Sequence, residues 1–418
     1  MVNEGSSTDV KRRAGWLPPS QDDLEAWLSG HRERTEAHGE DTPLHPVLVE
    51  FQQLMDTDPI VRMYVTQMVE QVPTGKQYKE RHVKDVPQLL RLINEVLTMT
   101  PEFSVGGMVS TPLAGILDWT LATPAGFAAY RDPRINAMLK KILNAWAEYL
   151  NSPDSLSALN RSETGWMSPE AERAVGMSDY AHDPDDEHWG FTSWNDFFTR
   201  RLAEGSRPVA APDDDKVIVS ACESTPYRIS TDVKRRDRFW AKSQPYSLED
   251  MLAHDESVDE FVGGTVYQAF LSALNYHRWH SPVAGTIVRA WVQEGTYYAE
   301  AQSEGPDAAE AQESQGYIAH MATRAIILVQ ADDPVIGLVA FIAIGMVEVS
   351  TCLISDHVRP GYHVAKGEEL GCFQFGGSSE CLIFRPGAVS EFTLAAIPQP
   401  GDADASLVLV RSRLAVAG

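Results

Sequence analysis

The apolar residues of this chain change their spacing about halfway along, and this change limits the folds open to it. In residues 46–150 they recur at helical spacing, as in Leu48, Phe51 and Met55. From Val217 onward they come in short runs separated by Gly and Pro turns, which is typical of β-strands. The pattern therefore predicts an α+β protein in which an all-helical region precedes a β-rich region.

Each region can be divided into expected elements. The helical spacing predicts helices at residues 86–99, 115–122 and 135–150, and two more within residues 46–72 that meet at Asp58-Pro59. Strands are predicted at residues 217–219, 286–292, 324–329, 338–349 and 407–416. The longest apolar stretch, residues 336–347, contains two glycines and is predicted as a pair of buried strands.

The expected domain boundary falls in residues 151–190, which are rich in loop-forming residues. The chain is therefore divided into three parts. Residues 1–45 are a mobile N-terminal segment, in which Gly15-Trp16-Leu17 can dock on the body of the protein. Residues 46–180 form a helical domain, and residues 181–418 form a β-rich domain.

The formal net charge of −24 limits the partners of the chain. Nucleic acid and anionic membrane surfaces repel such an acidic protein, so neither is an expected partner. No N-terminal apolar segment marks a secretory signal, and no apolar run reaches the length of a membrane span. The four cysteines are therefore expected as reduced thiols in a cytoplasmic protein, whose oligomeric state the sequence does not predict.

The stretch that carries chemistry is Phe375-Gly376-Gly377-Ser378-Ser379, close to the C-terminus. A strand pattern over residues 372–375 ends on two glycines, which adopt backbone conformations that other residues avoid. A serine hydroxyl held against a strained preceding carbonyl can attack it and move the acyl group from nitrogen to oxygen. Elimination of the resulting ester splits the chain and leaves a pyruvoyl group in place of the serine. Taken alone, Gly-Gly-Ser-Ser is more often an ordinary turn.

The surroundings of this turn resemble the self-cleavage site of the phosphatidylserine decarboxylase family. The resemblance rests on Lys366-Gly367-Glu368-Glu369-Leu370-Gly371-Cys372-Phe373-Gln374-Phe375 before the two glycines. It implies that the Gly377–Ser378 bond is cut into a long chain (1–377) and a short chain (378–418), and that Ser378 becomes a covalent pyruvoyl cofactor. Pyridoxal phosphate is then not expected. A second stretch, Phe197-Phe198-Thr199-Arg200 with Arg207-Pro208, is similar to the signature that opens the decarboxylase domain of this family.

Two histidines three residues apart lie in Tyr276-His277-Arg278-Trp279-His280. A metal pair is one interpretation, but a zinc site needs further ligands and no HExxH is present, so no metal is expected. The stretch resembles the Tyr-His-Arg-x-His motif of the family. The resemblance implies that His280 is the base that removes the Ser378 hydroxyl proton during self-cleavage. It implies that His277 lies near the pyruvoyl group and serves decarboxylation and protonation, and neutral imidazoles suit both roles.

Two further stretches are expected to reach the same site. Val219-Ser220-Ala221-Cys222-Glu223-Ser224 resembles the Ser-Pro-x-Asp-Gly run of the family, whose Asp orients the base histidine. Glu223 stands at the Asp position and Ser224 at the Gly position, so Glu223 is either the orienting acid or a plain loop carboxylate. Residues 344–351 resemble the strand that runs past the active site in the family, and their backbone is expected to help form the pocket.

The order of six motifs resembles one branch of the family, the soluble fungal L-tryptophan decarboxylases of the psilocybin-pathway type. They are Gly15-Trp16-Leu17, Thr57-Asp58-Pro59-Ile60-Val61, Ala125-Gly126-Phe127, Ala221-Cys222-Glu223-Ser224, Tyr276-His277-Arg278-Trp279-His280 and Phe375-Gly376-Gly377-Ser378-Ser379. The resemblance implies a self-processing decarboxylase of aromatic L-amino acids, with L-tryptophan and tryptamine as the first choice of substrate and product. A phosphatidylserine decarboxylase is the first alternative, and an unprocessed, non-enzymatic binding protein is the second.

Overall fold

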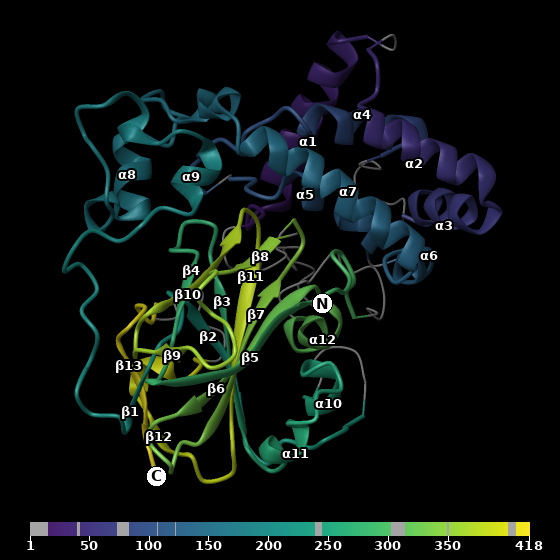
Figure 1. Ribbon diagram of the computed structural model, residues 1–418. Coiled ribbons are helices and arrows are strands. Elements are labelled where there is room, and N and C mark those ends of the chain that lie inside the picture. The colour runs from purple at the N-terminus through teal and green to yellow at the C-terminus, as the bar shows by residue number, and fades with distance from the viewer. Residues whose placement is uncertain are drawn as a thin grey trace, which may run out of the picture.

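The computed structural model describes residues 16–39, 42–72, 83–106, 108–121, 123–238, 245–301, 314–348, 351–399 and 407–418. Helices gather at the top of Figure 1 and β-sheets fill the lower half. The order of the elements confirms the predicted α+β class, with helices first and strands after them.

Most of the helices lie in the first half of the chain, and three short ones follow among the strands in the described part of the chain. They are α1 (Gln21–Ala37), α2 (Pro46–Thr57), α3 (Pro59–Glu70), α4 (Val86–Val96), α5 (Pro112–Leu121), α6 (Pro124–Ala129), α7 (Pro133–Leu150), α8 (Pro169–Val175), α9 (Trp194–Phe198), α10 (Leu248–Met251), α11 (Val258–Phe261) and α12 (Gln315–Met321). The predicted junction between α2 and α3 is confirmed. The Asp58 carboxylate accepts hydrogen bonds from Ile60 N–H (2.9 Å) and Val61 N–H (3.2 Å), which caps α3 at its proline start.

Helix α1 lies within the N-terminal segment for which the sequence predicts mobility. The helix buries Leu24, Leu28, His31 and Thr35, which recur along one face. The His31 ring is within hydrogen-bonding distance (3.0 Å) of the Leu92 carbonyl on α4, so the helix is fixed to the helical region. The sequence pattern missed this helix because only two of the four buried residues are apolar.

The strands follow in the second half and pair antiparallel throughout the described residues. They are β1 (Val217–Val219), β2 (Thr225–Ser230), β3 (Thr265–Leu271), β4 (Arg278–His280), β5 (Gly285–Gln293), β6 (Arg324–Ala331), β7 (Leu338–Gly345), β8 (Thr351–Ile354), β9 (His363–Val364), β10 (Glu369–Gln374), β11 (Ser378–Phe384), β12 (Val389–Phe392) and β13 (Arg413–Ala417). The long apolar stretch at residues 336–347 forms one buried strand, β7, rather than the predicted pair, because its glycines stand at the two strand ends.

The strands form one seven-stranded sheet and two smaller ones. The large sheet has the order β2-β3-β11-β7-β6-β5-β9, and the small sheets have the orders β4-β10-β8 and β1-β13-β12. Strand β11 is therefore internal, and β3 and β7 hydrogen-bond to it along its whole length. Since β11 begins at Ser378, the proposed cleavage site lies at the entrance to an internal strand.

The two faces of β11 contact different cores. Leu382 and Phe384 face a core that also holds Trp279 of β4 and Phe373 of β10. Cys381 and Ile383 face the other core, which is continuous with the helical region. Because side chains alternate along a strand, Ser378 shares the face of Leu382, between the large sheet and the β4-β10-β8 sheet.

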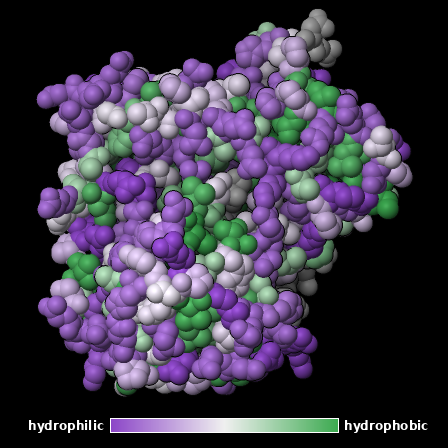
Figure 2. Space-filling view, in the orientation of Figure 1, coloured by the Kyte–Doolittle hydropathy of each residue, from purple (hydrophilic) through white to green (hydrophobic). Residues whose placement is uncertain are grey.

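Hydrophilic residues predominate on the face shown in Figure 2, and hydrophobic residues form separate patches among them. In the described ranges, no helix is both long and apolar enough to cross a membrane.

Candidate active site

The turn before Ser378 bends the chain from β10 of the β4-β10-β8 sheet into β11 of the large sheet. Phe375 has φ 20° and Gly376 has φ 102°, so this turn uses backbone conformations that favour glycine. Ser378 then pairs with Leu271 of β3 and with Gly345 of β7. The predicted strand before the two glycines is present as β10, which ends at Gln374, and the sharp bend falls at Phe375 and Gly376. Strain at the Gly377 carbonyl stays a prediction.

The Gly377 carbonyl and the Ser378 hydroxyl, the two groups that the predicted cleavage would use, have different environments. The Gly377 carbonyl accepts a hydrogen bond from Met346 N–H at 3.0 Å, and such a donor stabilises negative charge that develops on this oxygen. The Ser378 hydroxyl is fully buried and has no hydrogen-bond partner in the described structure. The carbonyl is therefore polarised, and the nucleophile is not engaged elsewhere.

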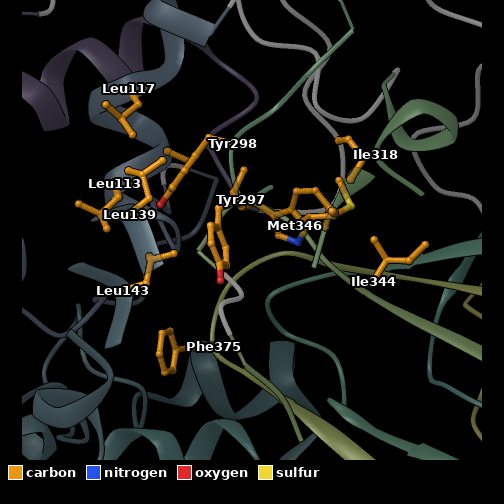
Figure 3. Close-up of a cluster of buried hydrophobic side chains, with 14 of the residues drawn as sticks. Leu113, Leu117, Leu139, Leu143, Tyr297, Tyr298, Ile318, Ile344, Met346 and Phe375 are labelled. Atoms are coloured by element: carbon orange, nitrogen blue, oxygen red, sulfur yellow. The ribbon is translucent and has the colours of Figure 1, made fainter. Parts of the chain in front are cut away.

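Helices α5 and α7 cover the other side of this turn. Figure 3 shows the cluster of buried hydrophobic side chains at this contact. The two helices contribute Leu113 and Leu117 of α5 and Leu139 and Leu143 of α7. These side chains lie near Tyr297, Tyr298, Met346 and Phe375. The ring of Trp146 on α7 meets Phe375 edge-on, with 5.2 Å between ring centroids. The helical region thus packs directly against the segment that contains the predicted cleavage site.

His277 is completely buried, and neither ring nitrogen has a hydrogen-bond partner among the described residues. Its ring stacks on Phe198 of α9 with 3.9 Å between centroids. Burial lowers the pKa of His277 well below its ordinary value, and the charge of Arg200 lowers it further. The same Arg200 donates to the carbonyls of Leu274 (2.6 Å) and Asn275 (3.1 Å), so the Phe-Phe-x-Arg signature holds the loop that carries His277.

His280 is also buried, but both of its ring nitrogens have partners. Nδ1 lies 2.9 Å from the Gly367 carbonyl, and Nε2 lies 3.0 Å from the Tyr276 hydroxyl. A carbonyl can only accept, so Nδ1 carries the proton and Nε2 accepts from Tyr276. Burial lowers the pKa of His280 to about 3, and the charge of Arg411 contributes, so the ring is neutral at pH 7.

Glu223 does not contact His280 in this structure. Its two oxygens accept hydrogen bonds from Nε and an Nη of Arg207, each at 3.0 Å. A two-point bond to a guanidinium is among the strongest that a carboxylate can make, which explains this choice of partner. The carbonyl of Gly367 takes the orienting position at Nδ1 that the resemblance assigns to an acidic residue, and a role of Glu223 in processing stays a prediction.

A chain of contacts nevertheless joins Glu223 to His280. Arg207, the partner of Glu223, offers its backbone carbonyl to Arg411 (3.4 Å). Arg411 Nε donates to the Gly367 carbonyl at 2.9 Å, and this is the oxygen that His280 contacts. One route from Glu223 to His280 thus runs through the two arginines and the Gly367 carbonyl. The backbone gives a second route, because His280 N–H donates to the Ala221 carbonyl at 2.8 Å, two residues before Glu223.

A second buried carboxyl group lies two residues after Ser378, on the same face of β11. Glu380 accepts a hydrogen bond from the Ser224 hydroxyl at 2.7 Å, while its other oxygen has no partner among the described residues. Burial raises the pKa of Glu380 to about 7. This contact explains why a serine replaces the family glycine at 224. The sequence analysis missed Glu380, although a charged residue before the apolar run Cys381-Leu382-Ile383-Phe384 is itself a signal.

An open cavity of about 420 Å³ lies between the N-terminal segment, helix α8 and the loop after β3. Its lining is mainly apolar, with one ion pair between Glu170 and Arg173 at 2.8 Å. One lining residue, Leu274, links the cavity to the candidate site. Leu274 lies three residues after Leu271, the sheet partner of Ser378, and three before His277. The other apolar lining residues include Leu17, Pro18, Phe103, Met108 and Ala174.

The fold places the predicted histidine segment beside the strand that precedes the Gly-Gly pair. The carbonyl of His277 accepts from Phe373 N–H (2.9 Å), and His280 of β4 pairs with Glu369 of β10. The segment with both histidines therefore lies beside β10, the strand that leads to Gly377. Residues 344–351 contribute through Met346 N–H, which agrees with the expected backbone role; Val349 and Ser350 lie outside the described residues. Among the described residues, no group of three or more His, Cys, Asp or Glu side chains is arranged to hold a metal ion.

Comparisons with known proteins agree with this arrangement. Two family models, both described as phosphatidylserine decarboxylase, match residues 45–175 and 194–401. A protein named decarboxylase iboD from Amanita muscaria is 41% identical over 330 residues, which cover 72% of this chain and 94% of the relative. The L-tryptophan decarboxylase of Psilocybe cubensis is 32% identical over 401 residues, which cover 90% of this chain and 88% of the relative.

A phosphatidylserine decarboxylase proenzyme of Schizosaccharomyces pombe is 31% identical over 201 residues, but these cover 48% of this chain and only 20% of the relative. The two fungal decarboxylases therefore share nearly their full length with this chain, whereas this proenzyme shares one part. The chain is a decarboxylase, and it belongs to the phosphatidylserine decarboxylase family.

Proposed function

We propose that this chain is the precursor of a pyruvoyl-dependent decarboxylase of aromatic L-amino acids, with L-tryptophan as the preferred substrate. The observation that carries the proposal is the geometry at Gly377–Ser378. A buried hydroxyl without a partner adjoins a carbonyl that accepts a backbone N–H, at a turn with positive φ angles. This arrangement suits attack of the serine on the preceding peptide bond.

In the first step, Ser378 Oγ forms a bond to the Gly377 carbonyl carbon and the Gly377–Ser378 C–N bond breaks. The hydroxyl proton passes through a base to the freed amine, and Met346 N–H stabilises the charge on the carbonyl oxygen. The ester then loses the Gly377 carboxylate and the Ser378 α-proton. Water then hydrolyses the resulting dehydroalanine, and its nitrogen leaves as ammonia. A pyruvoyl group remains at residue 378.

The histidines keep the roles that the resemblance implies. His280, with its proton fixed on Nδ1, presents Nε2 as the base for cleavage, and the Tyr276 hydroxyl is its immediate neighbour. His277 has both nitrogens available and is proposed to move the proton that replaces the substrate carboxylate. Glu223 is proposed as a positioning residue that acts through Arg207 and Arg411.

Members of this family carry a covalently bound pyruvoyl group, and the surroundings of Ser378 fit one. The unpartnered hydroxyl marks its place, and the buried site excludes water. A pyruvoyl ketone binds the amine of a substrate and takes up the electron pair that decarboxylation releases. The residues of this chain then have to hold the substrate side chain, exclude water and supply a proton.

The choice of an aromatic substrate rests on two observations. Two relatives of nearly the same length are L-tryptophan decarboxylases. The cavity beside Leu274 is apolar and large enough for an indole, and its lining includes loops that reach Leu271 and His277. We propose that this cavity receives the substrate side chain.

Phosphatidylserine is the alternative substrate, because it presents the same amine and α-carboxylate on a lipid. The net charge of −24 disfavours approach to the anionic bilayer in which it resides. Incubation with L-tryptophan, L-tyrosine, L-phenylalanine and phosphatidylserine vesicles, followed by mass detection of the amines, separates the two. If phosphatidylethanolamine is the main product, the substrate is phosphatidylserine and not an aromatic amino acid.

Intact-mass measurement of the denatured protein tests the processing. We expect two chains, 1–377 and 378–418, with a pyruvoyl mass at the start of the shorter chain. Ser378→Ala should remain full length and inactive. Ser379→Ala is the matched control, because Ser379 faces the other core and its hydroxyl bonds to the Ala269 carbonyl at 2.9 Å. An active Ser378→Ala protein would refute the mechanism.

A further inference from the structure

Residue Trp16 lies against the peptide bond that is proposed to break. Its side chain is 4% exposed, although it stands at the start of the described chain. A Cβ added to Gly377 would lie 2.9 Å from two atoms of the Trp16 ring, which is closer than such atoms approach in proteins. The indole therefore covers one side of Gly377 in direct contact, and only glycine fits beneath it.

The indole is fixed to the catalytic sheet by its ring nitrogen. Trp16 Nε1 donates to the Leu271 carbonyl at 2.9 Å, and Leu271 is the β3 partner of Ser378. The ring thus contacts the residue before the scissile bond and bonds to the strand beside the residue after it.

The backbone of Trp16 is fixed to the helical region. Its carbonyl accepts from Ser110 N–H and Oγ, both at 3.0 Å, and from Thr111 N–H at 3.3 Å and Oγ1 at 3.0 Å. These residues immediately precede helix α5. Four donors on one carbonyl oxygen hold the chain at this point far more firmly than a passing contact does.

The segment that carries Trp16 is outside the parts of the chain that the two family models match, which begin at residues 45 and 194. The contact with Gly377 is therefore an addition to the decarboxylase scaffold. It meets the scaffold at the flexible pair Gly376-Gly377, where the chain loses the most conformational freedom when it is ordered.

We propose that Trp16 is a positioning residue for self-cleavage, an inference that rests on the proposed function. The ring holds Gly377 so that its carbonyl oxygen stays on Met346 N–H, and it keeps water from the side of Gly377 that it covers. Ser378 Oγ then attacks from the open face, the new C–O bond forms as the C–N bond breaks, and the proton moves to the freed amine. Without the ring, the two glycines let the peptide leave this geometry.

Cleavage kinetics of the full chain test this role, with the cut fraction measured by denaturing gel and intact mass after a pulse of synthesis. Trp16→Ala should slow cleavage about tenfold or more, since small misplacements of reacting groups cost such factors. Trp16→Phe keeps a ring over Gly377 and should recover most of the rate. Trp27→Ala is the control, because this half-buried tryptophan of α1 contacts neither Gly377 nor Leu271 in the described structure.

Thermal unfolding of the same variants in a Ser378→Ala background separates positioning from stability. The inference stands if Trp16→Ala cleaves slowly at a melting temperature no lower than that of Trp27→Ala, and Trp16→Phe restores the rate. It is overturned if Trp16→Ala cleaves at the wild-type rate, or if both alanine variants lose rate in proportion to stability. An intact wild-type chain would overturn the proposed function as well, whereas a cleaved wild type with a normal Trp16→Ala variant overturns this inference alone.

Discussion

Burial sets the protonation of the residues around Ser378. His277 and His280 have lowered pKa values because the protein interior disfavours the charged imidazolium, and nearby arginines act in the same direction. The pKa of Glu380 is raised for the corresponding reason. All three side chains are therefore held towards their neutral forms, so they can exchange protons with a reacting group without first losing a counter-ion.

The two histidines should separate into a cleavage role and a turnover role. His280→Ala removes the imidazole next to Tyr276 and should leave the chain full length. His277→Ala should still cleave, at least in part, but should decarboxylate poorly because the proton donor is lost. Intact mass measures the first property, and amine release per pyruvoyl group measures the second. His363→Ala, at an exposed histidine beside Asp332, is the control, and normal turnover in His277→Ala would remove His277 from its role.

Glu380 should make the stability of the precursor depend on pH. Its pKa rises from 4.5 to about 7 in the folded state, so the folded chain binds more protons than the unfolded chain between these values. The free energy of unfolding therefore falls as pH rises through this window, by roughly 3 kcal/mol at 1.36 kcal/mol per pKa unit. Glu380→Gln should remove this contribution and so reduce the fall, as measured by denaturant unfolding in the Ser378→Ala background; the buried Glu348, whose pKa burial raises to about 8, contributes a fall of its own.

The control for Glu380 is Glu391→Gln, at an exposed position on β12. It removes one carboxylate from the surface and should leave the fall in stability between pH 4.5 and pH 7 in place. If the free energy of unfolding has the same slope against pH in the wild type and in Glu380→Gln, Glu380 does not titrate between these pH values.

Where a motif is local, the sequence shows which residues stand close together in the chain. Ser378, Gly377, His277 and His280 all belong to short runs, and the structure brings the runs together. The partner of Glu223 was not predictable in this way, because Arg207 stands in a separate motif and only the folded chain shows that its guanidinium meets the carboxylate. The pair of Ser224 and Glu380 joins residues 156 positions apart, so neither motif alone reveals it.

Strand β10 carries the cleavage turn and depends on close contact with its neighbours. A Cβ on Gly371 would lie 2.1 Å from the Leu353 carbonyl of β8 and 2.7 Å from the Trp279 ring of β4. Neither the backbone nor the buried ring can move away easily. Gly371 is thus the point at which the three strands of the small sheet approach each other.

Gly371→Ala should destabilise the protein by about 1–3 kcal/mol, the usual cost of forcing a methyl group into a packed interior. It should also slow cleavage, because β10 leads directly into Gly377. Gly30→Ala is the matched control, since its Cβ would meet only the end of Arg34 at 3.7 Å, in the middle of helix α1. That variant should gain about 0.5–1 kcal/mol. Chemical unfolding measures both changes, and equal effects would contradict the packing argument.

Elements with strong periodicity were predictable from the sequence, and weakly patterned ones were not. Helix α7 and strand β6 fall within the predicted ranges or a few residues beyond them. Helix α1 escaped prediction because a histidine and a threonine occupy half of its buried face. The contact between Trp16 and Gly377 joins residues near the two ends of the chain, so no local sequence pattern predicts it.

The position of β11 determines what cleavage can do to the molecule as a whole. The short chain 378–418 that the proposed cleavage would produce begins with an internal strand that pairs with β3 and β7 along all seven of its residues. It ends with β13, which pairs with β1 and β12. Removal of this chain would break the large sheet in the middle and expose both of its cores.

The two chains should therefore stay together after cleavage. Size-exclusion chromatography of the cut protein should give one peak that contains both chains, at the elution volume of the uncut Ser378→Ala protein. The chains should separate only in denaturant, because the sheet hydrogen bonds and both cores hold the short chain in place. A short chain released under native conditions would mean that β11 leaves the sheet once its N-terminal bond is cut. The pyruvoyl group would then depart with it, so stable association of the chains is a condition for turnover in this fold.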